Sequence, residues 1–233
     1  MSQKKCFVIY GAASDVVKPI FTNFFTDSFI CLINKDRPAH LLGDIILTGD
    51  DDYKSQLKAK LKEVPADNIL VFINAAVYTD DCLFVGHTAQ NLERMLTVGT
   101  HRVSEISQIL VAEMLSRRKG RLINLSSFRA KSPAKGTVVY SAIKAFAETL
   151  FKGIALEVGR FDITSNSIAL GFVDTKLLAG LPESSVQKFK RAVSKRRFVP
   201  EDQIILTLNY IIDSDYLNGA TIDLDGALLK LES

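Results

Sequence analysis

The stretch CFVIYGAASDVVK, residues 6–18, decides the fold more than any other part of the chain. Five apolar residues lead into Gly11, and a helical pattern begins a few positions later. A short and continuously apolar run followed by a glycine is typical of a strand that is buried on both faces and turns into a helix. The segment therefore predicts a strand, a tight turn and a helix over about 15–25.

The same alternation of short apolar runs and longer helical patterns continues along the chain. Further strands are predicted at 29–33, 44–48, 69–73 and 121–125, and weaker ones at 163–170 and 221–223. Further helices are predicted at about 53–61, 92–117, 138–159 and 200–212. Strands that alternate with helices form right-handed crossovers and a parallel sheet covered on both faces. We therefore predict one α/β domain over 1–233, a Rossmann-type doubly wound parallel sheet in three αβα layers.

One connection breaks this pattern. Only about ten residues, 34–43, separate the second predicted strand from the third, which is short for a parallel crossover. We expect the helix of this crossover to be missing or reduced to a turn.

The composition is that of an ordinary globular domain. Hydrophobic residues make up 47% and charged residues 24% of 233 residues. Cys6, Cys31 and Cys82 have no metal-like spacing, so no metal site is predicted, and buried thiols in a reducing compartment are expected. No apolar stretch reaches the length of a membrane span or a secretory signal. A cytoplasmic protein without a membrane partner is expected.

The net charge of +3 is spread along the chain, and one run is densely basic. This run contains Lys188, Lys190, Arg191, Lys195, Arg196 and Arg197. A solvated helix face is favoured over a nucleic-acid surface as the explanation of such a run. No nucleic-acid partner is predicted.

The turn after the first strand is where a dinucleotide phosphate loop would lie. Such a loop has three glycines, for a tight turn, for approach to the pyrophosphate and for helix packing. Only Gly11 is present, and Asp15 and Val17 fill the other two positions. A carboxylate at a helix N-terminus can cap the free amides itself and repel a phosphate. A self-capped helix without a nucleotide therefore stays open as an alternative.

The second half of the chain carries a more specific set of residues. Tyr140 and Lys144 are four residues apart, so a helix places them on one face. Ser127 stands thirteen residues before Tyr140, at the end of a predicted strand. The flanking segments are Asn74-Ala75-Ala76, residues 166–175 (NSIALGFVDT) and residues 217–226 (LNGATIDLDG).

In this order and spacing, these segments resemble the short-chain dehydrogenase/reductase family, especially its ketoacyl-carrier-protein-reductase-like branch. The resemblance runs from Cys6 to about Ala227. It implies that Tyr140 is the general acid or base, that Ser127 orients the substrate oxygen, and that Lys144 lowers the pKa of Tyr140 and holds the nicotinamide ribose. The implied cofactor-binding residues are Gly11, Ser14, Asn34, Asn74, Ala75, Tyr140, Lys144, Val173 and Thr175. A helix-face aromatic and a strand-end cap remain the alternative for Tyr140 and Ser127.

The chain departs from the family pattern at several positions. Gly99 stands where the family has the asparagine of its proton relay. Thr97 or His101 could supply a substitute polar group, although a solvated side chain is the alternative for His101. Milder departures are Ala76, Leu170 and Ala227, which replace Gly, Pro and Gly.

The segment after the second predicted strand bears on the choice of cofactor. Asn34, Lys35 and Arg37 favour the 2′-phosphate of NADP(H) over NAD(H), and Asp36 opposes this.

By analogy with the family, residues 176–199 form a lid over the substrate. Leu178, Leu181 and Phe189 either line a pocket there or pack the lid onto the domain. We also predict a homodimer or homotetramer through helices 92–117 and 138–159. The second of these helices carries an excess of apolar residues, Ala145, Phe146, Leu150, Phe151 and Ile154.

Three hypotheses for the function follow. The first is an oxidoreductase that transfers hydride between NAD(P)(H) and a small-molecule carbonyl or secondary alcohol. The second is a cofactor-free relative of such enzymes that serves as an assembly or regulatory subunit. The third uses the same three side chains for dehydration or isomerisation without a nucleotide.

Overall fold

The computed structural model describes residues 4–24, 27–33, 41–49, 51–173 and 182–228. All seven strands of the described chain form one parallel sheet in the order β3-β2-β1-β4-β5-β6-β7. The strands are β1 Lys5–Tyr10, β2 Ser28–Ile33, β3 Asp44–Leu47, β4 Ile69–Asn74, β5 Gly120–Ser127, β6 Ile163–Leu170 and β7 Thr221–Leu224. Every predicted strand is present, and the prediction of a doubly wound parallel sheet is confirmed.

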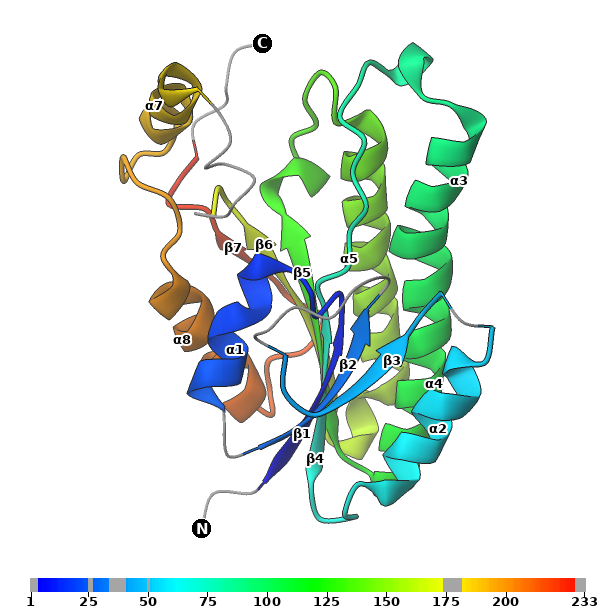
Figure 1. The fold of residues 1–233 in the computed structure, drawn as a ribbon. Coiled ribbons are helices and arrows are strands. Elements are labelled where there is room, and N and C mark those ends of the chain that lie inside the picture. Colours follow the sequence, from blue (N-terminus) through cyan, green and yellow to red (C-terminus); the bar gives the residue numbers. More distant parts are fainter. Residues whose placement is uncertain (1–3, 25–26, 34–40, 50, 174–181, 229–233) are drawn as a thin grey trace.

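The helices cover both faces of this sheet (Figure 1). They are α1 Lys18–Asn23, α2 Tyr53–Glu63, α3 Ala89–Leu96, α4 Arg102–Arg117, α5 Val138–Val158, α7 Glu183–Ala192 and α8 Glu201–Asp213. Helices α1 and α8 lie on one face, and α2, α4 and α5 lie on the other. None of the described helices is both long and apolar enough to cross a membrane.

The core consists of two apolar layers separated by the sheet. In β1, Phe7 and Ile9 pack on the α1 and α8 side, and Cys6, Val8 and Tyr10 pack on the other side. Side chains alternate between the faces of a strand, so a strand that is apolar at every position is buried on both faces. This burial explains why the sequence of β1 has no alternation of polar and apolar residues.

Two helix boundaries differ from the predictions. The first helix begins at Lys18, after a short 3₁₀ turn at Asp15–Val17. Pro19 has no amide hydrogen, so it cannot make the helical bond back to Asp15, and the amide of Lys18 donates to the Asp15 carbonyl instead. The predicted helix 92–117 begins earlier, at Ala89, and contains a π-helical turn at Thr97–His101. The predicted absence of a helix at 34–43 concerns mainly residues outside the described ranges.

The π-helical turn is held by a side chain from the sheet. The phenol of Tyr10, at the end of β1, donates to the carbonyl of Val98 at 3.0 Å. A π turn changes the regular pattern of backbone hydrogen bonds, and Tyr10 satisfies this buried carbonyl. The turn is thus fixed against the carboxyl end of β1, where β1 and β4 meet.

Candidate active site

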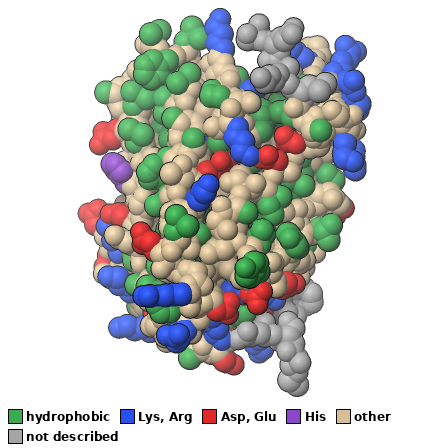
Figure 2. Space-filling view, turned by 180° about the vertical axis from the view of Figure 1, so that it is seen from behind, with side chains coloured by type: hydrophobic (Ala, Val, Ile, Leu, Met, Phe, Trp, Pro, Cys, Tyr) green, Lys and Arg blue, Asp and Glu red, His purple; other side chains and the backbone are tan. Residues whose placement is uncertain are grey.

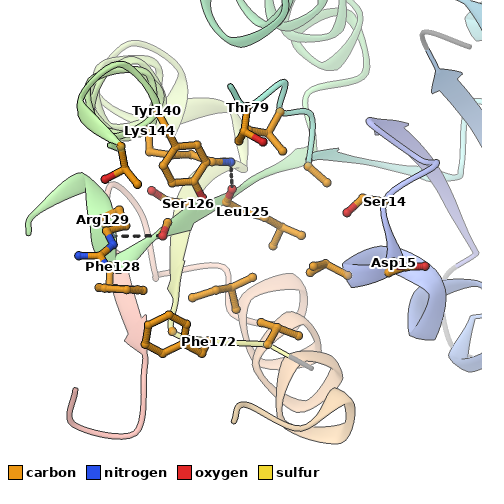
Figure 3. Close-up of a pocket in the computed structure, with 18 of the residues that line it drawn as sticks. Ser14, Asp15, Thr79, Leu125, Ser126, Phe128, Arg129, Tyr140, Lys144 and Phe172 are labelled. Carbon is orange, nitrogen blue, oxygen red and sulfur yellow. Dashed lines mark hydrogen bonds between the residues drawn. The ribbon is translucent and has the colours of Figure 1, made fainter. Parts of the chain in front are cut away.

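A cavity of about 570 Å³ lies at the carboxyl ends of the central strands. In open α/β sheets, ligands bind at this edge, where the direction of strand order reverses. The cavity extends from Ser14 and Asp15, in the turn after β1, to Tyr140 on α5 (Figure 3). Phe189 on α7 also lines it. The cavity therefore joins the loop predicted to bind phosphate to the residues predicted to transfer a proton.

Ser127, Tyr140 and Lys144 all line this cavity. Ser127 ends β5, and the first turns of α5 place Tyr140 and Lys144 on one face. The Ser127 hydroxyl accepts a bond from the amide of Arg129 at 3.2 Å and is close enough to Tyr140 to lower the pKa of the phenol. The structure thus brings together the three residues predicted to be catalytic, and their roles stay predictions.

Lys144 is the most deeply buried cation of this group. Its ammonium donates to the carbonyl of Leu125 at 2.9 Å and lies 5.9 Å from the centre of the Tyr140 ring (Figure 3). Burial lowers the pKa of Lys144 to about 8, and the carboxylate of Glu148 opposes this shift. Glu148 itself is held by the Ser126 hydroxyl, which donates to it at 2.6 Å.

The pKa of Tyr140 depends on burial, on a neighbouring hydroxyl and on nearby charges. Burial raises the pKa of the phenol, and the hydrogen bond to Ser127 and the positive charge of Arg129 oppose the rise. Arg129 is thus a cation that lowers the pKa of Tyr140, and the same effect of Lys144, whose ammonium lies 5.9 Å from the centre of the Tyr140 ring, stays a prediction.

Arg129 is a site residue that sequence reasoning missed. It lies in the short 3₁₀ turn Phe128–Ala130, lines the cavity, and places its guanidinium 4.6 Å from the centre of the Phe128 ring. Its position two residues after Ser127 was the only signal in the sequence.

The substrate side of the cavity is aromatic. Phe172 stacks on Phe189 of α7 at 4.7 Å between ring centres and contacts Phe128 at 5.1 Å. Phe189 lines the cavity and at the same time packs α7 onto the domain, so both roles considered for it are present. Helix α7 lies within the predicted lid 176–199, whereas Leu178 and Leu181 lie outside the described residues.

At the phosphate-loop end of the cavity, Gly11 occupies a position that only glycine fits. Gly11 has φ +83°, and a Cβ atom there would lie 2.5 Å from the backbone of Ala76. Ser14 and Asp15 line the cavity, but Asp15 is not the N-cap that the alternative interpretation required. Asp15 lies inside the 3₁₀ turn, and its carboxylate pairs with Lys18 at 2.7 Å. This ion pair neutralises part of the charge that would repel a phosphate.

The remaining predicted cofactor residues differ in their placement. Ala75 and Val173 line the cavity. The Asn74 side chain is buried, donates to Asn124 at 2.9 Å and accepts from the Ala76 amide at 3.4 Å, so it ties β4 to β5. Asn34 and Thr175 lie outside the described residues.

The position predicted to have lost the relay asparagine is tightly packed. Gly99 is buried in the π-helical turn, and a Cβ atom there would lie 2.3 Å from Cγ2 of Ile143 on α5. The side chain of Ile143 therefore occupies the space that a larger residue at position 99 would need. Thr97 and His101 are not among the residues that line the described cavity, and His101 is exposed.

Comparisons with known proteins identify the family of this chain. A family profile described as short chain dehydrogenase matches residues 43–185, more than half of the chain. The chain belongs to the short-chain dehydrogenase family. This membership confirms the predicted class of activity, an NAD(P)-dependent oxidoreductase, and favours it over the cofactor-free alternative.

Relatives of this short-chain dehydrogenase include two bacterial reductases. A 3-oxoacyl-[acyl-carrier-protein] reductase of Thermotoga maritima is 26% identical over 241 residues, covering 97% of this chain and 98% of the relative. Its counterpart in Aquifex aeolicus is 27% identical over 164 residues, which are 70% of this chain and 66% of the relative. The crystal structure of such a reductase from Brucella melitensis has a TM-score of 0.82 at 19% identity and covers 99% of this chain and 92% of the other, which shows the shared fold.

Proposed function

We propose that this protein transfers hydride between NADP(H) and a carbonyl or secondary alcohol, with Tyr140 as the proton donor or acceptor. The observation that supports this proposal is that one cavity is lined by Ser127, Tyr140 and Lys144 and also by the turn that follows β1 in the sequence. When bound, the dinucleotide supplies or accepts the hydride. The side chains of the protein then have to position the carbonyl oxygen and to supply the proton.

The proton step depends on three side chains. Tyr140 gives its proton to the carbonyl oxygen, and Ser127, which lines the same cavity, orients that oxygen. Arg129 stabilises the phenolate that remains. The buried Lys144 donates to the carbonyl of Leu125 and lines the same cavity, where it would hold the nicotinamide ribose.

The walls of the cavity suit a dinucleotide. Gly11 keeps the backbone of the first turn against Ala76, and Gly171 does the same against Asp225, where a Cβ atom would lie 2.7 Å from Cα. Gly171 and the residues Ser14 and Asp15 of the first turn line the cavity, so the two glycines fix the backbone course of its walls. The preference for NADP(H) rests on Asn34, Lys35 and Arg37, which lie outside the described residues.

The aromatic group Phe128, Phe172 and Phe189 supports a substrate whose carbonyl is carried on an apolar chain. A 3-oxoacyl group of the kind named for the bacterial relatives has this character. Arg129 at the same end favours a substrate with an additional acceptor or negative charge.

We also propose that the protein forms a homo-oligomer through α4 and α5. Phe146 and Leu156 of α5 are 39% and 84% exposed, and both are available for such a contact. Phe151, counted in the sequence analysis as surplus apolar surface, is instead fully buried and stacks on Phe72 of β4. The thiols of Cys6 and Cys31 are buried in the core, which supports a reducing, cytoplasmic location.

A thermal titration with NADPH and NADH tests the cofactor proposal. Ligand at one hundred times its dissociation constant should stabilise the protein by about 2.7 kcal/mol. We expect the larger shift with NADPH, and no shift with either nucleotide at millimolar concentration would overturn the proposal.

Tyr140→Phe tests the chemistry separately. This variant should lose activity by about 10²–10⁴-fold because it has no proton to transfer, while the NADPH-induced stabilisation stays largely in place. Tyr210→Phe, which changes an exposed tyrosine of α8, is the matched control and should keep full activity. Equal activity of the two variants would exclude Tyr140 as the acid or base.

A further inference from the structure

Three potential metal ligands converge in the connection between β4 and α3, outside the residues assigned to proton transfer. They are Asp80, Cys82 and His87, whose potential ligand atoms all lie within 4.8 Å of one another. Nδ1 of His87 lies 3.3 Å from Sγ of Cys82 and 3.4 Å from Oδ2 of Asp80, and the sulfur and this oxygen are 4.0 Å apart. A carboxylate oxygen, a thiol sulfur and an imidazole nitrogen thus face one point.

These distances fit the edges of a zinc coordination sphere. Ligand atoms bound at about 2.0–2.3 Å around a tetrahedral zinc ion are about 3.3–3.8 Å apart. Two of the three observed distances lie in this range, and the third exceeds it by little. Oxygen, sulfur and nitrogen are all zinc ligands, and a site with three protein ligands leaves the fourth position to water.

Hydrogen bonding among the three groups explains the arrangement less well. Both short contacts of His87 use the same atom, Nδ1, and a ring nitrogen has a single lone pair or a single proton to offer. The distance of 4.0 Å between Cys82 and Asp80 is at the limit even for a bond to sulfur. A cation at the centre satisfies all three atoms at once, with Nδ1 as a ligand.

The surroundings hold two of these ligands in place. The side chain of His87 is buried, with 2% of its surface exposed, so its ring is fixed by the packing of the loop. The side-chain amide of Asn91 donates to Oδ2 of Asp80 at 2.7 Å. Asn91 is itself held in place because its backbone amide donates to Oγ1 of Thr88, the N-cap of α3. A bonded carboxylate held in this way is typical of metal sites, where such outer contacts orient the ligands.

We propose that Asp80, Cys82 and His87 bind one divalent cation of the zinc type. The sequence analysis predicted no metal site because it considered only the spacing of the cysteines. None of the three ligands is among the residues assigned to the reaction, so this cation site is separate from the proton-transfer residues.

The position of the loop gives this cation a consequence for the cavity. Thr79 and Asp81, on either side of Asp80, line the cavity, and the charge of Asp81 contributes to the raised pKa of Tyr140. The same loop exposes Leu83, Phe84 and Val85, which are 53%, 61% and 91% accessible. In Figure 2, hydrophobic side chains gather at the upper left, the end of the molecule where the loop between β4 and α3 lies in that view. A bound ion would fix both the cavity wall and this apolar tip.

Metal analysis after dialysis against micromolar ZnCl₂ tests the proposal. We expect about one zinc per chain in the unaltered protein, and a loss of at least 100-fold in affinity in Cys82→Ser and His87→Gln. His101→Gln, which changes an exposed histidine of the π-helical turn, is the matched control and should bind zinc as the unaltered protein does. Asn91→Ala should weaken binding by about 10–100-fold, the effect of removing an outer contact.

Cobalt(II) provides a readout that does not depend on the variants folding. Substitution of Co²⁺ for Zn²⁺ in the unaltered protein should give a thiolate-to-cobalt charge-transfer band in the near ultraviolet, together with visible bands of tetrahedral intensity. Substoichiometric zinc in the unaltered protein would overturn the proposal, as would a cobalt spectrum without the thiolate band. Equal zinc content in folded Cys82→Ser, checked by circular dichroism, would overturn it too. None of these measurements involves the nucleotide or turnover, so the proposed oxidoreductase activity can fail without affecting them.

Discussion

The packing of Gly99 against Ile143 allows a quantitative prediction. In an ordinary helix, Gly→Ala stabilises by up to about 1 kcal/mol. At position 99, a new Cβ would lie 2.3 Å from Cγ2 of Ile143. Ile143 is itself 5% exposed and packs with Met95 and Val139, so it has little room to move away. Overpacking of this kind costs about 1–3 kcal/mol. We therefore expect Gly99→Ala to destabilise the protein by up to about 2 kcal/mol.

A double-mutant cycle isolates this contact. Ile143→Leu removes the branch at Cβ that carries Cγ2, keeps the volume of the side chain, and should cost less than about 1.5 kcal/mol alone. In that background, Gly99→Ala should be neutral or stabilising. The coupling between the two substitutions is then about 1–3 kcal/mol. Urea denaturation at one fixed protein concentration measures all four free energies of unfolding.

Gly153→Ala is the matched control for this cycle. Gly153 lies in α5, and a Cβ atom there would meet no atom within 4 Å. This substitution should stabilise the protein by up to about 1 kcal/mol, or about 2–4 °C in Tm. If Gly99→Ala stabilises the protein as much as Gly153→Ala does, and equally in both backgrounds at position 143, the packing explanation for the glycine is refuted.

Four further predictions follow from the site and its surroundings. Asp15→Ser removes a carboxylate from the cavity wall and should tighten NADPH binding about 3- to 10-fold, as measured by nucleotide fluorescence. Unchanged or weaker binding would show that the ion pair with Lys18 already cancels the charge of Asp15. Burial lowers the pKa of Lys144 to about 8, so above that pH the unfolded chain binds more protons than the folded protein does. Between pH 8 and pH 9.5 the unaltered protein should therefore gain roughly 1–2 kcal/mol of stability relative to Lys144→Met. Parallel stability profiles of the two proteins over this pH range would contradict this. The Arg129 guanidinium lowers the pKa of Tyr140, so in Arg129→Gln the rate of alcohol oxidation should begin to rise at a higher pH than in the unaltered protein. Lys131→Gln is the control: it breaks an exposed ion pair with Asp223 and should leave the pH profile of the rate unchanged. Ala227 has φ +58°, the left-handed conformation that glycine adopts without strain. Ala227→Gly should therefore raise the free energy of unfolding by about 1 kcal/mol, measured by urea denaturation. A lower free energy of unfolding in the variant would contradict this.

The fold could be predicted from the sequence to a large extent, because parallel strands buried on both faces have a distinctive pattern. The runs at β1, β2 and β4 are apolar at nearly every position, and the structure buries them between two helical layers. The exact beginning of α1 could not be predicted in the same way. It depends on the missing amide hydrogen of Pro19, whose effect competes with the helical pattern around it.

The candidate site was predictable where one regular element sets the geometry. The helical repeat alone places Tyr140 and Lys144 on one face, and the end of a strand places Ser127 at the edge of the sheet. The effects of Asp81 and Arg129 on the pKa of Tyr140 were not predictable, because a loop places Asp81 and a short turn after β5 places Arg129.

The sequence by itself thus determined the order of the elements, the parallel sheet and the spacing of the proton-transfer residues, since each follows from the fixed repeat of a helix or a strand. Tertiary structure alone decided that Ile143 occupies the space beside Gly99 and that Asp80, Cys82 and His87 meet in one loop. These contacts join different elements or irregular backbone, where no repeat fixes the distance between side chains. Packing volume and loop conformation set those distances, and both depend on the whole fold.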